Sequence, residues 1–207
     1  MKGTSTALVI ATLLGSGNAW AQAAIPECRA AATTLQQNAL QAQVGVLVKN
    51  DCPQMYSAGW LTGTGTILKS GPLPACNDAW ANLQASLGVL NAAKEFVTRN
   101  CPAIYMGLGW RTGPAATAPI PACDKAEADL NALGKLTQAS NALKQRCVQL
   151  YQNSWLVQIG GGTNTCETIW SGLTTANALA PARELITHNC PSLYTGGYVT
   201  SGSPIRP

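Results

Sequence analysis

Eight cysteines divide the chain into four similar stretches. In chain order they form the pairs Cys28/Cys52, Cys76/Cys101, Cys123/Cys147 and Cys166/Cys190. The two members of a pair are 24, 25, 24 and 24 residues apart, and successive pairs begin 48, 47 and 43 residues apart. Regular spacing of this kind indicates an internal repeat, here with a period of about 45 residues. The chain is therefore predicted to contain four copies of one structural unit.

The first half of each unit has the apolar pattern of a helix. Small or apolar residues follow the first cysteine by three positions and a leucine follows it by seven, as Ala31 and Leu35 follow Cys28. The equivalent pairs are Ala79 and Leu83, Ala126 and Leu130, and Ile169 and Leu173. Positions zero, three and seven share one face of an α-helix. Each unit is thus predicted to begin with an amphipathic helix.

The middle of each unit carries a signal that ends a helix. The residues are Asn38, Gly88, Gly134 and Asn177, each followed two positions later by a leucine. Asparagine and glycine tolerate the left-handed conformation that ends many helices. A second helix then leads to the second cysteine. The predicted fold is all-α, with four tandem helical hairpins at residues 25–63, 73–113, 120–158 and 164–202 and linkers rich in Gly, Thr and Pro.

The hairpin geometry predicts one disulfide within each unit. Two antiparallel helices bring the start of the first helix beside the end of the second, whereas one continuous helix would hold the cysteines about 36 Å apart. The predicted disulfides are Cys28–Cys52, Cys76–Cys101, Cys123–Cys147 and Cys166–Cys190. Pairing between neighbouring units, such as Cys52 with Cys76, is the main alternative. A metal site is not expected, because no CxxC motif is present.

The first residues have the pattern of a secretory signal peptide. A lysine at position 2 precedes the apolar stretch 7–14, and small residues lead to a cleavage site after Ala21 or Ala23. The apolar stretch is too short to span a bilayer as a stable helix. We therefore expect a signal peptide at residues 1–21, a periplasmic or secreted mature protein, and no membrane span.

The low content of charged residues and the absence of a basic cluster argue against a nucleic-acid partner. Charged residues are 11% of the chain, against roughly 25% in ordinary soluble domains. The formal net charge is +4 and no basic cluster occurs. Nucleic acid is therefore not an expected partner.

The sequence offers no catalytic constellation. His188 is the only histidine, and it follows Glu184 by four residues as Arg99 follows Glu95. Residues four apart on a helix form surface charge pairs, which is the simpler interpretation of both. We expect no enzyme activity, no catalytic residue, no metal and no cofactor.

Repeated aromatic residues are the candidate binding residues. A tyrosine follows the second cysteine of each unit, at Tyr56, Tyr105, Tyr151 and Tyr194, and a further aromatic follows at Trp60, Trp110, Trp155 and Tyr198. Trp80 and Trp170 occur in only two units. The tyrosines are interpreted as packing under the disulfides, and the second set as sealing the joints between hairpins. The alternative is that both sets form a row of contact faces for glycans or a partner protein. Trp80 and Trp170 are interpreted as surface contacts.

These observations favour a non-enzymatic exported protein that acts as a structural or interaction scaffold, as an accessory subunit of an extracytoplasmic assembly. The expected partner is another protein or further copies of the chain. The alternative is a binding module for a glycan or an apolar small ligand. A concave row of aromatics would favour the alternative, and aromatics buried at repeat joints would favour the scaffold.

Overall fold

The computed structural model describes residues 25–63, 74–105, 107–111, 120–157, 162 and 164–199. In these residues the structure consists of helices α1 to α11 and one 3-10 helix, with no strand. The predicted all-α class is confirmed. The predicted signal peptide, residues 1–21, and most of the predicted linkers lie outside the described residues.

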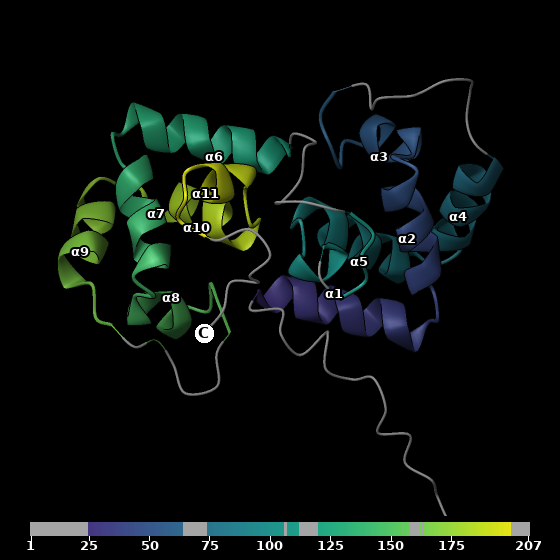
Figure 1. Ribbon diagram of the computed structural model, residues 1–207, viewed down its shortest axis with the longest axis horizontal. Helices are drawn as coiled ribbons and strands as arrows, with labels where there is room; N and C mark the ends of the chain where they lie inside the picture. Colours follow the sequence, from purple (N-terminus) through teal and green to yellow (C-terminus); the bar gives the residue numbers. More distant parts are fainter. Residues whose placement is uncertain are drawn as a thin grey trace, which may run out of the picture.

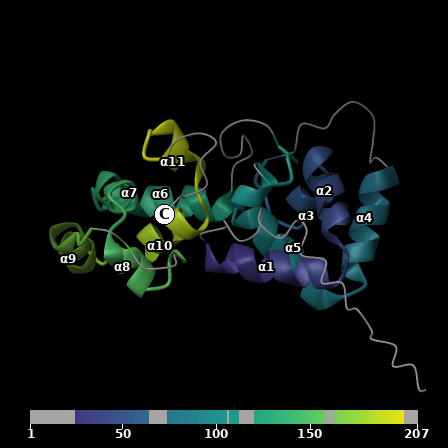
Figure 2. The same ribbon diagram turned by 60° about the horizontal axis from the view of Figure 1, so that its bottom comes forward.

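The helices form two lobes that lie side by side (Figures 1 and 2). The first lobe, within residues 25–111, contains α1 (Pro26–Gln37), α2 (Gln41–Lys49), α3 (Pro53–Ser57), α4 (Pro74–Gln84), α5 (Leu87–Thr98) and the 3-10 helix η1 (Pro102–Ile104). The second lobe, within residues 120–199, contains α6 (Pro121–Ala132), α7 (Leu136–Lys144), α8 (Val148–Gln152), α9 (Glu167–Thr175), α10 (Leu179–Thr187) and α11 (Pro191–Thr195). Each lobe therefore contains two of the four repeats.

In each lobe, the helices of one repeat pack mainly on the helices of the other repeat. In the first lobe α1 packs on α5 and α2 packs on α4; in the second lobe α6 packs on α10 and α7 on α9. The first helix of one repeat thus packs on the second helix of the other repeat, and the second helix of the one packs on the first helix of the other. This is the reciprocal contact of a two-fold symmetric pair, built here within one chain.

The disulfides follow this packing between repeats, so the prediction of one disulfide within each repeat is wrong. The bonds are Cys28–Cys101, Cys52–Cys76, Cys123–Cys190 and Cys147–Cys166. The first cysteine of each repeat is bonded to the second cysteine of its partner repeat. Pairing between neighbouring repeats, the alternative for Cys52 and Cys76, is the arrangement that occurs.

The two helices of each hairpin diverge, which explains why the observed disulfide pairing differs from the predicted one. Figure 1 shows α1 and α2 steeply inclined to each other, and the same is true of α6 and α7. Leu35 of α1 and Leu47 of α2 are both fully buried. Two helices of this length cannot bury enough apolar surface on their own. The apolar faces are covered by the partner repeat, and the cysteines at the open ends meet partners from that repeat.

The turns between helices are left-handed in three repeats. In the first repeat the left-handed residue is Ala39, with φ +56°, and not the predicted Asn38. The predicted residues Gly134 and Asn177 do have positive φ, at +62° and +52°. Gly88 does not: α4 ends without a left-handed residue, Ser86 has an extended backbone, and Gly88 lies inside α5.

Candidate functional site

Helix ends determine where the repeated cysteines and aromatics lie. The residue before each second cysteine has positive φ, and so does the residue before each following aromatic. These residues are Asp51, Asn100, Arg146 and Asn189 before cysteines, and Gly59, Gly109, Ser154 and Gly197 before aromatics. The amide of Cys52 donates to the carbonyl of Leu47 (2.9 Å) and that of Trp60 to Met55 (2.8 Å). This six-to-one bond marks a Schellman motif, in which the residue after the left-handed position folds back onto its helix.

Four of the six candidate binding residues form two equivalent tryptophan pairs. The ring centroids of Trp60 and Trp80 are 5.0 Å apart, and those of Trp155 and Trp170 are 4.9 Å apart. Trp60 and Trp155 are buried, whereas Trp80 and Trp170 are half-buried. Trp80 and Trp170 therefore lie at joints between repeats and also present part of their rings to solvent.

The other two candidate residues have different surroundings. Trp110 is half-buried, with its ring centroid 5.8 Å from that of Phe96. Its indole covers Gly45 of α2 so closely that a Cβ there would lie 2.8 Å from Cε2. Tyr198 is half-buried and lies against Gly196. Both rings therefore pack against their own lobe.

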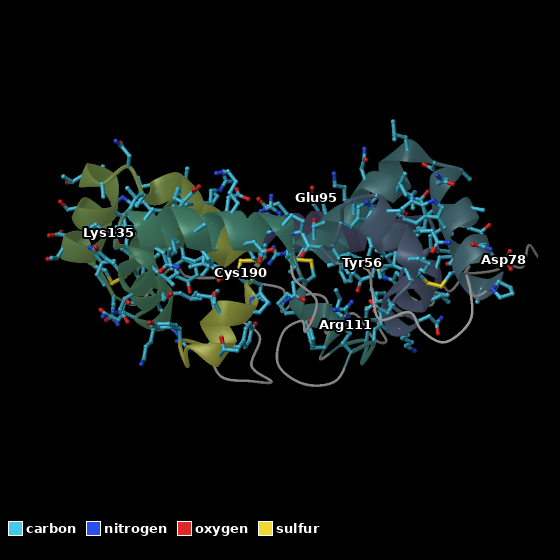
Figure 3. The ribbon with its side chains drawn as sticks, turned by 90° about the horizontal axis from the view of Figure 1, so that it is seen from above. Tyr56, Asp78, Glu95, Arg111, Lys135 and Cys190 are labelled. Carbon is cyan, nitrogen blue, oxygen red and sulfur yellow. A yellow bond between two sulfur atoms is a disulfide. The ribbon has the colours of Figure 1, made fainter. Side chains whose placement is uncertain are left out.

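The six aromatics are not brought into one row. The Trp60–Trp80 pair involves α4, and the Trp155–Trp170 pair involves α9, which lie at opposite ends of the molecule in Figure 1. In Figure 3 Asp78 of α4 marks one end and Lys135 lies near the other, with Cys190 between them. The structure therefore shows two separate aromatic pairs, one in each lobe.

Three of the four repeated tyrosines bond to the left-handed residue before the second cysteine of their repeat. The hydroxyls of Tyr105 and Tyr194 donate to the side-chain oxygens of Asn100 and Asn189, both at 2.6 Å, and Tyr56 bonds to Asp51. Burial raises the pKa of Tyr194 to about 12. The Tyr194 hydroxyl therefore stays protonated, and the three hydrogen bonds fix the ends of the second helices in repeats one, two and four.

The ends of α5 and α10 meet at the junction between the lobes. The side-chain amide of Asn100 donates to the carbonyl of Asn189 (3.2 Å), and that of Asn189 donates to the carbonyl of Asn100 (3.1 Å). Six polar or charged residues are buried in the described part of the chain, and all except Ser140 belong to these two helix ends. The junction is therefore where the molecule concentrates its buried polar groups.

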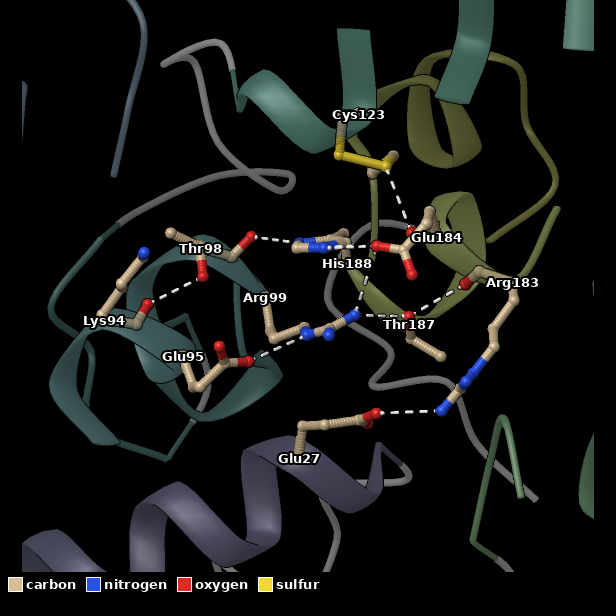
Figure 4. A network of polar contacts seen from close by, with 11 residues as sticks. Glu27, Lys94, Glu95, Thr98, Arg99, Cys123, Arg183, Glu184, Thr187 and His188 are labelled. Carbon is tan, nitrogen blue, oxygen red and sulfur yellow. Dashed lines mark hydrogen bonds and ion pairs between the residues drawn. A yellow bond between two sulfur atoms is a disulfide. The ribbon is translucent and has the colours of Figure 1, made fainter. Parts of the chain in front are cut away.

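His188 lies in this junction (Figure 4). Its Nδ1 is 2.7 Å from the carbonyl oxygen of Thr98, across the junction, and its Nε2 is 2.9 Å from Oε2 of Glu184. Burial lowers the pKa of His188, and the neighbouring Arg99 lowers it further, while the contacts with Thr98 and Glu184 oppose the shift. The expected helix pair with Glu184 thus forms, but it is not the surface pair that was expected, because the imidazole is buried while the Glu184 side chain is partly exposed.

Arg99 is the second cation of the junction. Its Nε is 3.1 Å from Oε2 of Glu95, which is the other expected helix pair, and its Nη1 donates to Oγ1 of Thr187 at 2.7 Å. The backbone carbonyls at two helix ends carry partial negative charge, so cations are favourable there. Arg183 and Glu27 add an ion pair of 3.5 Å between α10 and α1.

The contacts of His188 do not resemble a general base beside a nucleophile. Both of its neighbours, the Thr98 carbonyl and the Glu184 carboxylate, are hydrogen-bond acceptors, and neither has a proton for a base to remove. Over the described ranges, no group of three or more His, Cys, Asp or Glu side chains is placed to hold a metal ion.

The junction was not predicted as a site, although the sequence holds a signal for it. Repeats two and four read Thr-Arg-Asn-Cys at 98–101 and Thr-His-Asn-Cys at 187–190. Repeats one and three read Lys-Asn-Asp-Cys at 49–52 and Lys-Gln-Arg-Cys at 144–147. A neutral threonine in place of an exposed lysine distinguishes the two helix ends that become buried.

Comparison with known proteins yields no relative: no protein-family model, curated protein or solved structure matches the chain. Four disulfides are typical of proteins that fold in an oxidising, extracytoplasmic compartment. Within the part of the chain that the structure describes, no helix is long and apolar enough to cross a membrane.

Proposed function

We propose that the protein is a non-enzymatic interaction scaffold, exported to the periplasm or beyond the cell and working as an accessory subunit of an extracytoplasmic assembly. The protein would offer two similar lobes to its partner. Each lobe would present the outer tryptophan of its pair, Trp80 in the first and Trp170 in the second.

The observation that carries this proposal is the equivalence of the two tryptophan pairs. Their centroid distances, 5.0 and 4.9 Å, and their interplanar angles, 47° and 46°, are nearly the same. In each pair the inner ring is buried and the outer ring is half-buried. An aromatic ring held rigidly by a second ring can bury area on a partner without losing much side-chain freedom, which is typical of interface hot spots.

The contacts of the ionisable side chains at the junction also favour a scaffold over an enzyme. His188, Arg99 and Glu184 contact one another or backbone groups of the opposite lobe. These contacts hold two helix ends together, which is a structural task.

The glycan or apolar-ligand alternative relies on aromatics that line one surface. Trp60 and Trp155 are buried within their lobes, and the two pairs belong to different lobes. This arrangement favours contact with an extended partner at two points over the binding of one small ligand.

The proposal is tested by capture of partners from the native extracytoplasmic fraction on immobilised, oxidised protein. We expect a specific partner on the wild type and at least tenfold less on a variant with Trp80→Ala and Trp170→Ala. The matched control is Leu87→Ala, because Leu87 is a 71% exposed apolar side chain outside both pairs. Thermal melting of each variant shows whether a loss reflects unfolding.

Three results would count against the proposal. One is the absence of any retained protein together with a monomeric sedimentation profile, which would leave neither a partner nor self-assembly. Another is equal capture by the wild type and the double tryptophan variant. The third is saturable quenching of tryptophan fluorescence by a neutral oligosaccharide without any protein partner, which would favour the glycan-binding alternative.

A further inference from the structure

The boundary between the lobes differs in kind from the interior of each lobe. All four disulfides join helices of the same lobe. The extensive helix pairs, such as α1 with α5 and α6 with α10, also lie within a lobe. The two helix ends at the junction are joined by polar contacts from buried asparagine, threonine and histidine side chains and from the half-buried Arg99. The lobes can therefore separate without breaking a disulfide bond.

His188 is the group in this junction that titrates near neutral pH. It is 6% exposed, and its ring nitrogens face two acceptors, the Thr98 carbonyl at 2.7 Å and the Glu184 carboxylate at 2.9 Å. A neutral imidazole has one N–H and can donate to only one of them. A protonated imidazole can donate to both, but its charge must then be held in a buried position beside Arg99.

Other charged and titratable groups lie in or beside the junction. They are Glu184 and Arg183 on α10, Glu95 and Arg99 at the end of α5, Glu27 on α1, and the tyrosines Tyr105 and Tyr194 bonded to the junction asparagines. Arg99 lies 3.7 Å from the same Glu184 oxygen that His188 contacts. The carboxylate that would balance a histidinium is therefore already shared with an arginine.

We propose that the junction is an acid-sensitive switch, in which protonation of His188 separates the two lobes while each lobe keeps its disulfide-bonded fold. Separation exposes the ring to water, where the charged form is no longer penalised by burial.

The sign of the effect follows from linkage. In the joined state burial lowers the pKa of His188 below its ordinary value, which is about 6.5. In the separated state the exposed ring regains that ordinary value. The separated state therefore binds more protons, so it gains population as the pH falls below about 6.5 towards the lowered value. Above that window the junction has its full stability.

The chain offers an unambiguous measurement, because His188 is its only histidine. A proton NMR titration of the imidazole Hε1 reports its pKa in the intact wild-type protein. Small-angle X-ray scattering over the same pH range reports the radius of gyration, and far-UV circular dichroism reports helix content. We expect the histidine to titrate below 6.5, with a rise in the radius of gyration over the same pH range and no loss of helix signal.

Two variants identify the group responsible. His188→Gln places at this position the residue found in the third repeat, Gln145, and is expected to remove the expansion. Glu184→Gln removes the carboxylate but keeps the histidine, so this variant is expected to retain the expansion at low pH. A radius of gyration that stays constant through the histidine titration would overturn the proposal, and so would a pKa at or above 6.5. Expansion that persists in His188→Gln but disappears in Glu184→Gln would assign the switch to Glu184 instead.

Discussion

Arg146→Asn is expected to stabilise the protein, because Arg146 occupies a left-handed position to which it is poorly suited. Its φ is +53°. Two of the three equivalent residues, Asn100 and Asn189, are asparagines that also accept hydrogen bonds from Tyr105 and Tyr194 at 2.6 Å. In the described part of the chain the hydroxyl of the matching Tyr151 has no such partner. Arg146→Asn therefore supplies both a residue that tolerates the backbone conformation and the missing acceptor.

The expected change in the free energy of unfolding for Arg146→Asn has three contributions. The left-handed conformation costs an ordinary L-residue about 1–2 kcal/mol, most of which asparagine avoids. A new hydrogen bond contributes about 0.5–1.5 kcal/mol. Loss of a cation near the end of α7 costs about 0.3–1 kcal/mol. The net expectation is a gain of about 1–2 kcal/mol, with a rise in Tm of about 2–4 °C for each kcal/mol.

Denaturant titration of the oxidised protein measures this gain, and a double-mutant cycle separates its parts. Tyr151→Phe is made alone and together with Arg146→Asn. The coupling between the two changes gives the hydrogen bond, which should be about 0.5–1.5 kcal/mol. If Arg146→Asn is no more stable than the wild type, the left-handed residue does not strain the third repeat as the structure indicates.

Three further predictions concern the paired repeats. Peptide mapping without reduction should recover the four disulfides between partner repeats, and a dominant peptide linking Cys28 to Cys52 would show that the repeats are closed locally. Gly45→Ala should destabilise the protein by about 1–3 kcal/mol, because its Cβ would lie 2.8 Å from the Trp110 indole. The matched Gly88→Ala on α5 should stabilise the protein by up to about 1 kcal/mol, because its Cβ would meet nothing within 4 Å. The same sign for both alanines in urea titrations would contradict this contrast. Trp60→Ala should cost about 3–5 kcal/mol as a buried ring, and the half-buried Trp80→Ala clearly less; equal losses in thermal melting would contradict it.

The helices were predictable because local sequence determines them. Prolines at 26, 74 and 121 stand at the first position of α1, α4 and α6, where the missing N–H and fixed φ suit a helix start. Gly134 and Asn177 end helices as expected. Gly88 does not, because Ser86 has an extended backbone and is the N-cap of α5, which begins at Leu87, one residue before Gly88. A glycine inside a helix and one beyond its end give the same sequence pattern.

The disulfide pairing was not predictable from the same pattern. The spacing of the apolar residues in α1 and α2 is compatible both with packing on each other and with packing on the partner repeat. Cysteine spacing is the same in both cases, because each repeat supplies one cysteine at a helix start and one at a helix end. What decides between them is the angle within the hairpin, and that angle depends on turn geometry and on packing beyond the repeat.

The lobe junction explains why the four repeats, although similar, are not interchangeable. Thr98 and Thr187 lie three residues before the second cysteine in repeats two and four and are buried. The equivalent residues in repeats one and three are Lys49 and Lys144, and both are exposed. A lysine at this position could not be buried against another helix end without an acidic partner. The two lysines therefore disfavour a further junction of the same kind at the second helix ends of repeats one and three.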